Sequence, residues 1–303
     1  MNLVIDIGNT HTKIGWFEGT TLRRQDRLVH RSEVADLLRQ PPSVAAVMIS
    51  SVAGIPVAGN PVRFPAGTGT PVAGTPVADI LSSLQLPERS VYTLDGSTPL
   101  PFVNTYLTPA TLGTDRIAAV AGAQRWHPAQ SVLVIDAGTC ITYDVIDPAG
   151  VYRGGIISPG MQMRLRAMHT FTARLPLVAL NRPADDPLAG PGEESPQVIA
   201  SSLDQVRPLS SSSAAHRLTE RDTEAGLRSG AVRGAAAEIS QMIRMYADKF
   251  SDLHVILCGG DASYLLPYVY QDRPIPPERI TEVAALILIG LNCILQHNVN
   301  QQK

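Results

Sequence analysis

Two short Asp-x-Gly sequences are the residues of this chain best suited to chemistry on phosphates. They are residues 6–8 (Asp-Ile-Gly) and 136–138 (Asp-Ala-Gly), and each ends a run of apolar residues. Glycine lets backbone N–H groups approach phosphate oxygens, because no Cβ stands in the way. A carboxylate at a strand end can hold Mg²⁺ through water, or another cation directly. Since phosphoryl transfer depends on such positioning and electrostatics, the two sequences predict a site for nucleotide phosphates.

Polar residues beside these sequences would strengthen the site. The added side-chain donors are Asn9, Thr10, Thr12, Thr139 and Thr142, and Lys13 adds a positive charge. A single Asp-x-Gly is more often an ordinary hairpin turn, because turns favour both residues. Two copies in matching contexts favour the phosphate site instead.

A third group could act on the phosphate acceptor. Residues 112–116 (Leu-Gly-Thr-Asp-Arg) stand at the start of an expected helix. Asp115 could accept a proton from a hydroxyl group, and Arg116 could pair with a carboxylate in a fork-like geometry. The alternative is structural: Thr114 or Asp115 caps the helix, and the arginine is simply solvated.

The sequence lacks the motifs of several other nucleotide-binding and hydrolase sites. The chain contains no G-x-x-x-x-G-K-[ST], so a P-loop kinase is not expected. No G-x-G-x-x-G opens a helix after a strand, and the G-x-S-x-G elbow of many hydrolases is missing.

The elements that must position these residues form an internal repeat with an offset of about 130 residues. Residues 3–12 and 133–142 share six identities in ten aligned positions, including the Asp and the Gly. In each copy an apolar strand turns through glycine into a second strand, over 12–17 and 141–146, which predicts two β-hairpins. The offset is longer than a solenoid period, so we expect a duplicated domain.

The remaining pattern alternates strands with helices and indicates an α/β fold. The other expected strands are 45–51, 151–157 and 254–257, and the expected helices are 114–125, 161–172, 228–250 and 282–296. Two stretches, 52–78 and 181–222, have the composition of inserted loops.

Charge, cysteine content and apolar stretches argue against several classes of partner and location. The net charge of −2 without a long basic run argues against nucleic acid as the main partner. Three separated cysteines form no C-x-x-C pair, which favours a reducing compartment over a zinc ribbon or disulfide framework. The first residues lack signal-peptide character, and the apolar stretch 283–291 is about half a membrane span. We therefore expect a cytoplasmic protein that does not enter the membrane.

Taken together, the motifs resemble the type III pantothenate kinase family, which belongs to the superfamily of acetate kinase, sugar kinases, Hsp70 and actin. The matching pieces occur in order through most of the chain: residues 6–13, 49–52, 112–116, 136–144, 154–160, and Thr223, Glu224 and Gly230.

The resemblance implies two duplicated ribonuclease H-like, or actin-like, domains, 1–118 and 119–303, with a nucleotide cleft between them. It also implies transfer of the ATP γ-phosphoryl group to pantothenate, giving 4′-phosphopantothenate, in the first step of coenzyme A biosynthesis. The cofactors would be Mg²⁺ and a monovalent cation, K⁺ or NH₄⁺, and the protein would be a homodimer. Two alternatives stay open: a non-catalytic transcription-accessory protein of the same fold, or a kinase of the superfamily for another small hydroxyl or carboxylate acceptor.

The resemblance also implies roles for single residues. The ATP-binding residues would be Asp6, Ile7, Gly8, Asn9, Thr10, His11, Thr12, Lys13 and Thr139. The pantothenate-binding residues would be Tyr106, Gly113, Thr114, Asp115, Arg116 and Thr223, with Asp115 as the proton acceptor. Asp136 would bind the monovalent cation. Apart from the resemblance, the place of Asp6 at a strand end predicts that it could hold Mg²⁺ through water.

Overall fold

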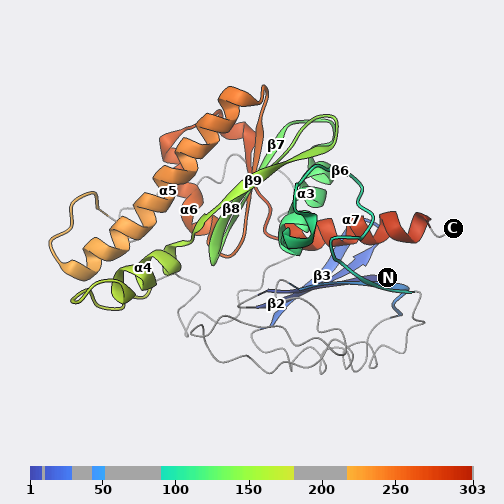
Figure 1. Cartoon of the computed structure of the whole chain (residues 1–303), viewed down its shortest axis with the longest axis horizontal. Coiled ribbons are helices and arrows are strands. Elements are labelled where there is room, and N and C mark those ends of the chain that lie inside the picture. Colours follow the sequence, from blue (N-terminus) through green and yellow to red (C-terminus); the bar gives the residue numbers. More distant parts are fainter. Residues whose placement is uncertain (9–10, 29–42, 52–89, 181–216, 302–303) are drawn as a thin grey trace. The chain divides into compact units, whose positions relative to one another are not determined.

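The computed structural model describes residues 1–8, 11–28, 43–51, 90–180 and 217–301 (Figure 1). The chain divides into two compact units: unit 1 comprises Met1–Trp126 and Ala285–Lys303, and unit 2 comprises His127–Ala284. The predicted insertion 52–78 lies outside the described residues, and so does 181–216 of the second insertion. None of the described helices is both long enough and apolar enough to span a membrane.

Unit 1 is built on a mixed sheet in the order β3-β2-β1-β4-β5. Its strands are β1 (Asn2–Ile7), β2 (Thr12–Glu18), β3 (Thr21–Leu28), β4 (Ala46–Ser51) and β5 (Val91–Thr93). The pairs β1/β2 and β2/β3 are antiparallel, whereas β1/β4 and β4/β5 are parallel. Every residue of β4 and all but the first of β1 are buried, which explains why both read as apolar runs in the sequence.

Two helices of unit 1 pack closely together and support this sheet. They are α3 (Thr114–Trp126) and α7 (Leu286–Gln301), and α7 also contacts β1, β4 and β2. A Cβ on Gly290 of α7 would clash with the Ala118 carbonyl group of α3, so the two backbones are in direct contact. A short strand, β6 (Val103–Asn104), and a 3₁₀ helix, η2 (Pro109–Thr111), lie on the connection from β5 to α3.

Unit 2 repeats this plan. Its strands are β7 (Val132–Ala137), β8 (Cys140–Ile146), β9 (Val151–Pro159), β10 (His254–Cys258) and β11 (Ile280–Glu282), in the order β9-β8-β7-β10-β11. The pairs β7/β8 and β8/β9 are antiparallel, and β7/β10 and β10/β11 are parallel. Order and direction thus match unit 1 strand for strand, as expected for two copies of one domain.

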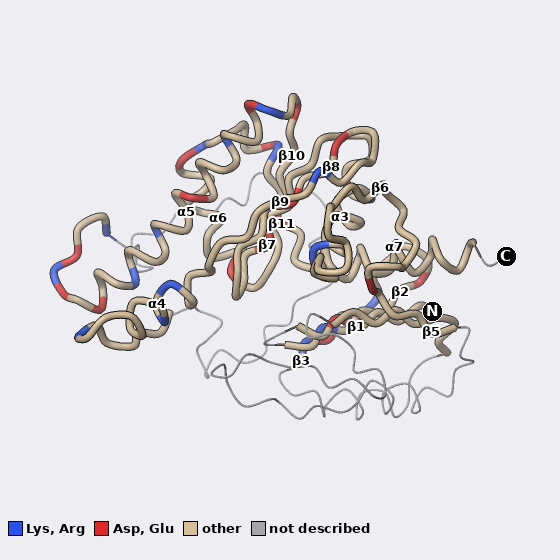
Figure 2. The backbone as a smooth tube through the Cα atoms, viewed as in Figure 1, with Lys and Arg blue, Asp and Glu red and all other residues tan. Residues whose placement is uncertain are grey.

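The helices of unit 2 are α4 (Met161–Thr170), α5 (Thr223–Lys249) and α6 (Ala262–Asp272), with a 3₁₀ helix η5 (Pro277–Arg279) before β11. Apolar residues of α5 and α6 join those of β7, β8 and β10 in one buried core. Helix α5 carries charged residues of both signs along its length (Figure 2).

The two hairpins differ by one residue. Asp6 pairs with Lys13 across the first hairpin, whereas Asp136 pairs with Thr142 across the second. The first turn is therefore one residue longer, and the alignment of Thr12 with Thr142 shifts by one in the structure.

Most predicted elements are confirmed, but two helix starts are corrected. The terminal helix begins at Leu286 rather than 282, because Glu282 belongs to β11. Helix α5 begins at Thr223 rather than 228, because the Asp222 carboxylate accepts a hydrogen bond from the Ala225 N–H at 2.8 Å and caps the helix.

The units also divide the chain differently from the predicted halves. The predicted boundary between residues 118 and 119 falls inside α3, whereas unit 1 continues to Trp126 and includes α7. Helix α7 follows β11 of the second copy, and α3 follows the matching strand β5 of the first, after the connection that carries β6. We propose that residues 1–118 and 119–303 correspond to the two duplicated copies, whereas the compact units describe how the chain packs.

Candidate active site

Asp6 carries the strongest signal for chemistry in unit 1. Its side chain lies near the end of β1 and is only 5% exposed. Burial raises the pKa of Asp6 from 3.8 to about 6; Lys13 and a hydrogen bond with Ser50 lower it, and the charge of Asp115 raises it. Within the described residues, Oδ1 of Asp6 has no hydrogen-bond partner. Because burying such an oxygen is costly, the site is suited to a ligand that brings positive charge.

Strand register and one hydrogen bond bring the neighbours of Asp6 together. Lys13 stands opposite Asp6 in the β1/β2 pair, and Ser50 stands opposite Asp6 in the β1/β4 pair. The Ser50 hydroxyl donates to Thr114 Oγ1 at 3.0 Å, which joins the end of β4 to the start of α3. We call these residues, namely Asp6, Lys13, Ser50, Thr114 and Asp115, the Asp6 cluster.

The predicted acceptor segment also forms one group in unit 1. Asp115 lies in the first turn of α3, where the helix dipole favours a negative charge, and its Oδ1 accepts the Arg116 N–H at 2.9 Å. Arg116 is 5% exposed, and its guanidinium carbon lies 5.5 Å from the centre of the Tyr106 ring. Gly113 directly precedes the helix, and its carbonyl accepts the Ile117 N–H at 3.1 Å. Arg116 thus links Tyr106 to the start of α3, where Asp115 lies.

The first turn is only partly described. Gly8 donates its N–H to the His11 carbonyl at 3.0 Å, which closes the turn. Asn9 and Thr10 lie outside the described residues. Ile7 and Thr12 are buried, at 5% and 2% exposure, so their side chains support the turn from the interior. The His11 ring lies 3.3 Å from Nη2 of Arg27.

The second turn is held by three segments of unit 2. Gly138 donates to the Cys140 carbonyl at 2.9 Å within the turn itself. Gly160, after β9, donates to the Thr139 carbonyl at 3.1 Å, and Asp261, after β10, donates to the Ala137 carbonyl at 2.9 Å. The turn that carries Thr139 is therefore fixed from both sides.

Asp136 faces a position where only glycine fits. Gly259 has a φ of 93°, and a Cβ there would clash with the Asp136 carboxylate and the Ala137 carbonyl. The oxygens that these contacts identify are those of Asp136 itself and of the Ala137 carbonyl, and oxygen is the ligand atom that hard cations prefer. Across the described part of the chain, no group of three or more His, Cys, Asp or Glu side chains is placed to hold a metal ion.

Thr223 is the one predicted acceptor residue that belongs to unit 2. It is exposed at the first position of α5, directly after the capping Asp222. Its role in acceptor binding stays a prediction.

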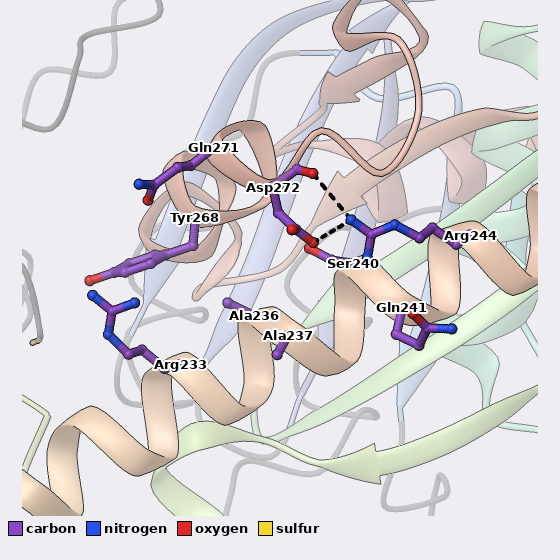
Figure 3. Close-up of a pocket in the computed structure, with 9 residues that line it drawn as sticks. All are labelled: Arg233, Ala236, Ala237, Ser240, Gln241, Arg244, Tyr268, Gln271 and Asp272. Carbon is purple, nitrogen blue, oxygen red and sulfur yellow. Dashed lines mark hydrogen bonds and ion pairs between the residues drawn. The ribbon is translucent and has the colours of Figure 1, made fainter. Parts of the chain in front are cut away.

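An open groove of about 650 Å³ lies elsewhere on unit 2, between α5 and α6 (Figure 3). None of the predicted site residues lines it. Its polar side chains include Arg233, whose guanidinium carbon lies 5.9 Å from the centre of the Tyr268 ring, and Arg244, which pairs with Asp272 at 2.8 Å. These contacts join α5 to α6, and we assign the groove no function.

Sequence reasoning missed several residues that shape the two turns. Ser50 belongs to a matched motif but received no role; its signal is a polar residue at the end of a strand that is otherwise apolar. Gly160 ends a matched segment and Gly259 follows an expected strand, but neither has a sequence signal for this role, because their close approach to the second turn depends on tertiary structure.

The fold and the turns define a class of protein, the duplicated ribonuclease H-like proteins to which actin-like phosphotransferases belong. A crystal structure from Campylobacter jejuni, described as a Baf family transcriptional activator, shares this fold. It is similar over 98% of this chain and 99% of its own, with a TM-score of 0.50 and 18% sequence identity.

Sequence comparison identifies the family within this class. The profile of type III pantothenate kinases matches residues 2–201. A type III pantothenate kinase from Christiangramia forsetii is 34% identical, over 99% of this chain and 100% of its own length. One from Bacteroides fragilis is also 34% identical, over 98% of each chain. The chain belongs to the type III pantothenate kinase family, which confirms the resemblance seen in the motifs.

Proposed function

We propose that this chain catalyses ATP-dependent phosphorylation of pantothenate to 4′-phosphopantothenate, the first step of coenzyme A biosynthesis. Family membership supports the reaction, and the observation that carries it in the structure is the Asp6 cluster. There, the buried carboxylate of Asp6, near the end of β1, stands opposite Ser50, whose hydroxyl donates to Thr114 at 3.0 Å, next to Asp115 in the chain. The charge of Asp115 accordingly raises the pKa of Asp6. Residues predicted for ATP and for the acceptor thus lie side by side in unit 1.

The proposed transfer balances as follows. The terminal hydroxyl oxygen of pantothenate bonds to the γ-phosphorus, the bond from that phosphorus to the bridging oxygen breaks, and ADP leaves. The hydroxyl proton passes to the carboxylate of Asp115. Because the transition state of phosphoryl transfer is loose, little deprotonation is needed early, so Asp115 also acts by orienting the hydroxyl.

Arg116 and Tyr106 are proposed to recognise the acceptor. Pantothenate carries a carboxylate, and a guanidinium group binds a carboxylate through two parallel hydrogen bonds. The Tyr106 ring beside Arg116 would fix the direction of that fork. We include Gly113, Thr114 and Thr223 in the same role.

The cations and the ATP contacts are also proposals. Asp6, whose buried Oδ1 has no hydrogen-bond partner among the described residues, would hold Mg²⁺ through water, and Asp136 would hold K⁺ or NH₄⁺. When bound, Mg²⁺ would offset the negative charge of the phosphates. Lys13, with the first turn, and Thr139, in the second, would bind the phosphates themselves.

We further propose that the protein works as a homodimer in the cytoplasm, where its substrates ATP and pantothenate meet. Light scattering on the purified protein tests the oligomeric state, and a mass of one chain would contradict the dimer.

The direct test of function is release of ADP with and without pantothenate, in potassium and in sodium buffer. We expect release that requires pantothenate and is faster in potassium. Release only with another acceptor, such as a sugar or a small carboxylic acid, would indicate a different kinase of the superfamily. No release with any acceptor would favour the non-catalytic, transcription-accessory alternative.

A further inference from the structure

The second turn of unit 2 rests on the end of β9. Besides the hydrogen bond from Gly160 to Thr139, Pro159 pairs with Cys140 across the β8/β9 ladder. A Cβ on Gly160 would clash with the carbonyl groups of Gly138 and Thr139, so the two backbones are in contact. Any movement of the Pro159–Gly160 segment must therefore move the turn.

One arginine fixes this segment from α4. Arg164 donates from Nε to the Pro159 carbonyl at 2.9 Å and from Nη2 to the Ser158 hydroxyl at 3.2 Å. Its own N–H donates to the Gly160 carbonyl at 3.0 Å. The last two residues of β9 and the glycine that follows them are thus bonded to a single residue.

Arg164 is in turn held by α5 and β8. Its Nη2 lies 2.5 Å from Oε2 of Glu238, and the Tyr143 hydroxyl donates to Oε1 of Glu238 at 2.9 Å. Tyr143 is fully buried, while the side chains of Arg164 and Glu238 are 22% and 28% exposed. Helices α4 and α5 are in contact, and Figure 1 shows both beside β8 and β9.

Glu238 keeps its charge in this setting. Burial alone would raise the pKa of Glu238, but hydrogen bonds from Arg164, Ser158 and Tyr143 outweigh it and hold the pKa below its usual value. A charged carboxylate with both oxygens engaged orients its partner more strongly than a neutral group would.

We propose that Tyr143, Arg164 and Glu238 are positioning residues for ATP: through the end of β9 they fix the second turn, and with it Thr139, in the conformation that binds the nucleotide phosphates. The inference rests on the proposed function of the second turn. Tyr143 lies within the matched segment 136–144 but received no role there, and Arg164 and Glu238 lie outside the matched segments. None of the three is proposed to contact ATP itself.

The test uses Arg164→Met and Glu238→Gln in the full-length protein, with Arg244→Met as a matched control. Arg244 also joins α5 to a neighbouring helix through a carboxylate, Asp272, but does not touch the turn. We expect both test variants to raise KM for ATP about tenfold, as befits hydrogen bonds to charged groups, and to leave KM for pantothenate within twofold. The control should change neither constant.

A merely structural network would give a different result. It would lower the melting temperature while leaving KM for ATP unchanged, or would raise both KM values together, and either outcome overturns the inference. If Arg164→Met does not fold, Tyr143→Phe, which removes only the donor to Glu238, should still raise KM for ATP.

Direct calorimetric measurement of ATP binding separates this inference from the proposed function. If the wild type does not phosphorylate pantothenate, the proposed function fails, but weaker ATP binding by Arg164→Met would still support the positioning role. Equal ATP binding by variant and wild type, or no ATP binding by the wild type, would refute it.

Discussion

Within the Asp6 cluster, the buried carboxylate of Asp6 lowers the stability of the folded protein when it is ionised. The Asp6 carboxylate is 5% exposed, and one of its oxygens has no partner among the described residues. Burying a carboxylate in this way costs free energy, so packing alone does not explain it. Lys13 and Ser50 relieve part of this cost, while Asp115 adds to it. Stability given up at a defined group is typical of a site prepared for a ligand.

Replacing Asp6 with Asn should therefore stabilise the protein at neutral pH while abolishing phosphoryl transfer. The unfolded chain ionises Asp6 near pH 3.8 and the folded chain near pH 6, so the folded state binds the extra proton between these values. The cost in the wild type is thus absent below pH 4 and complete above pH 6. The shift corresponds to about 3 kcal/mol at most, so we expect a gain of about 1–3 kcal/mol at pH 8 in urea unfolding that vanishes near pH 4.

Asp95→Asn is the matched control, with the opposite sign. Hydrogen bonds from Ser97 lower the pKa of Asp95; burial partly offsets them, and hydrogen bonds from Thr98 lower the pKa further. The ionised form of Asp95 therefore stabilises the folded state at pH values above the ordinary pKa of an Asp side chain, and this stability is lost as the pH falls. The Asn substitution should therefore destabilise the protein at neutral pH. A destabilised Asp6→Asn at pH 8 would contradict the interpretation of Asp6.

Tyr106 gives a second prediction for a single residue. Tyr106→Leu removes the ring beside Arg116, and cation–π contacts are worth about 0.5–2 kcal/mol, so KM for pantothenate should rise by about 2- to 30-fold. KM for ATP should stay the same. Tyr106→Phe, which keeps the ring, should lie much closer to wild type; an unchanged pantothenate KM in the Leu variant would remove Tyr106 from the acceptor site.

On the scale of helices and strands, much of unit 1 depends on the last helix of the chain. Asn292 of α7 is 2% exposed; it donates to the Gly19 carbonyl at 2.9 Å and accepts from Asn2 at 3.1 Å. Together with the backbone contact at Gly290, these bonds attach α7 to the start of the chain and to the α3 helix that carries Asp115.

Gly290→Ala tests this packing. The added Cβ would overlap the Ala118 backbone, which cannot move cheaply, so we expect a loss of about 1–3 kcal/mol or more. The control is Gly230→Ala in α5, where no described atom lies within 4 Å of the new Cβ and alanine favours the helix by up to about 1 kcal/mol. Thermal unfolding of both variants measures the difference; equal melting temperatures would show that α3 and α7 are not closely packed.

The elements also show how far the sequence could predict the structure. Strands β1, β4, β7 and β10 are apolar runs and were predicted nearly to the residue. Strand β3 was missed because it is an edge strand and half of its residues are charged, and β5 and β11 are only three residues long. Helix α6 contains Pro267, which weakens any helical pattern read from sequence.

The whole molecule is best understood as one domain used twice. Both units have the same strand order and the same strand directions, and each places an Asp-x-Gly sequence at the end of its central hairpin. The repeat predicted from ten positions is confirmed by topology. What the sequence could not predict is how the copies have diverged: only unit 1 has the longer turn and the Asp6 cluster, and only unit 2 has the network of Tyr143, Arg164 and Glu238.

The central claim is that the Asp6 cluster performs phosphoryl transfer to pantothenate, with Asp115 taking the hydroxyl proton. The most direct measurement follows labelled γ-phosphate from ATP into pantothenate, for the wild type and for Asp115→Asn, while ATP affinity is measured in parallel. We predict labelled 4′-phosphopantothenate from the wild type, and a rate about 10²–10⁴-fold lower for Asp115→Asn with ATP affinity within a few-fold of wild type. An Asp115→Asn variant that transfers label at the wild-type rate, or a wild type that labels no pantothenate, would contradict the account.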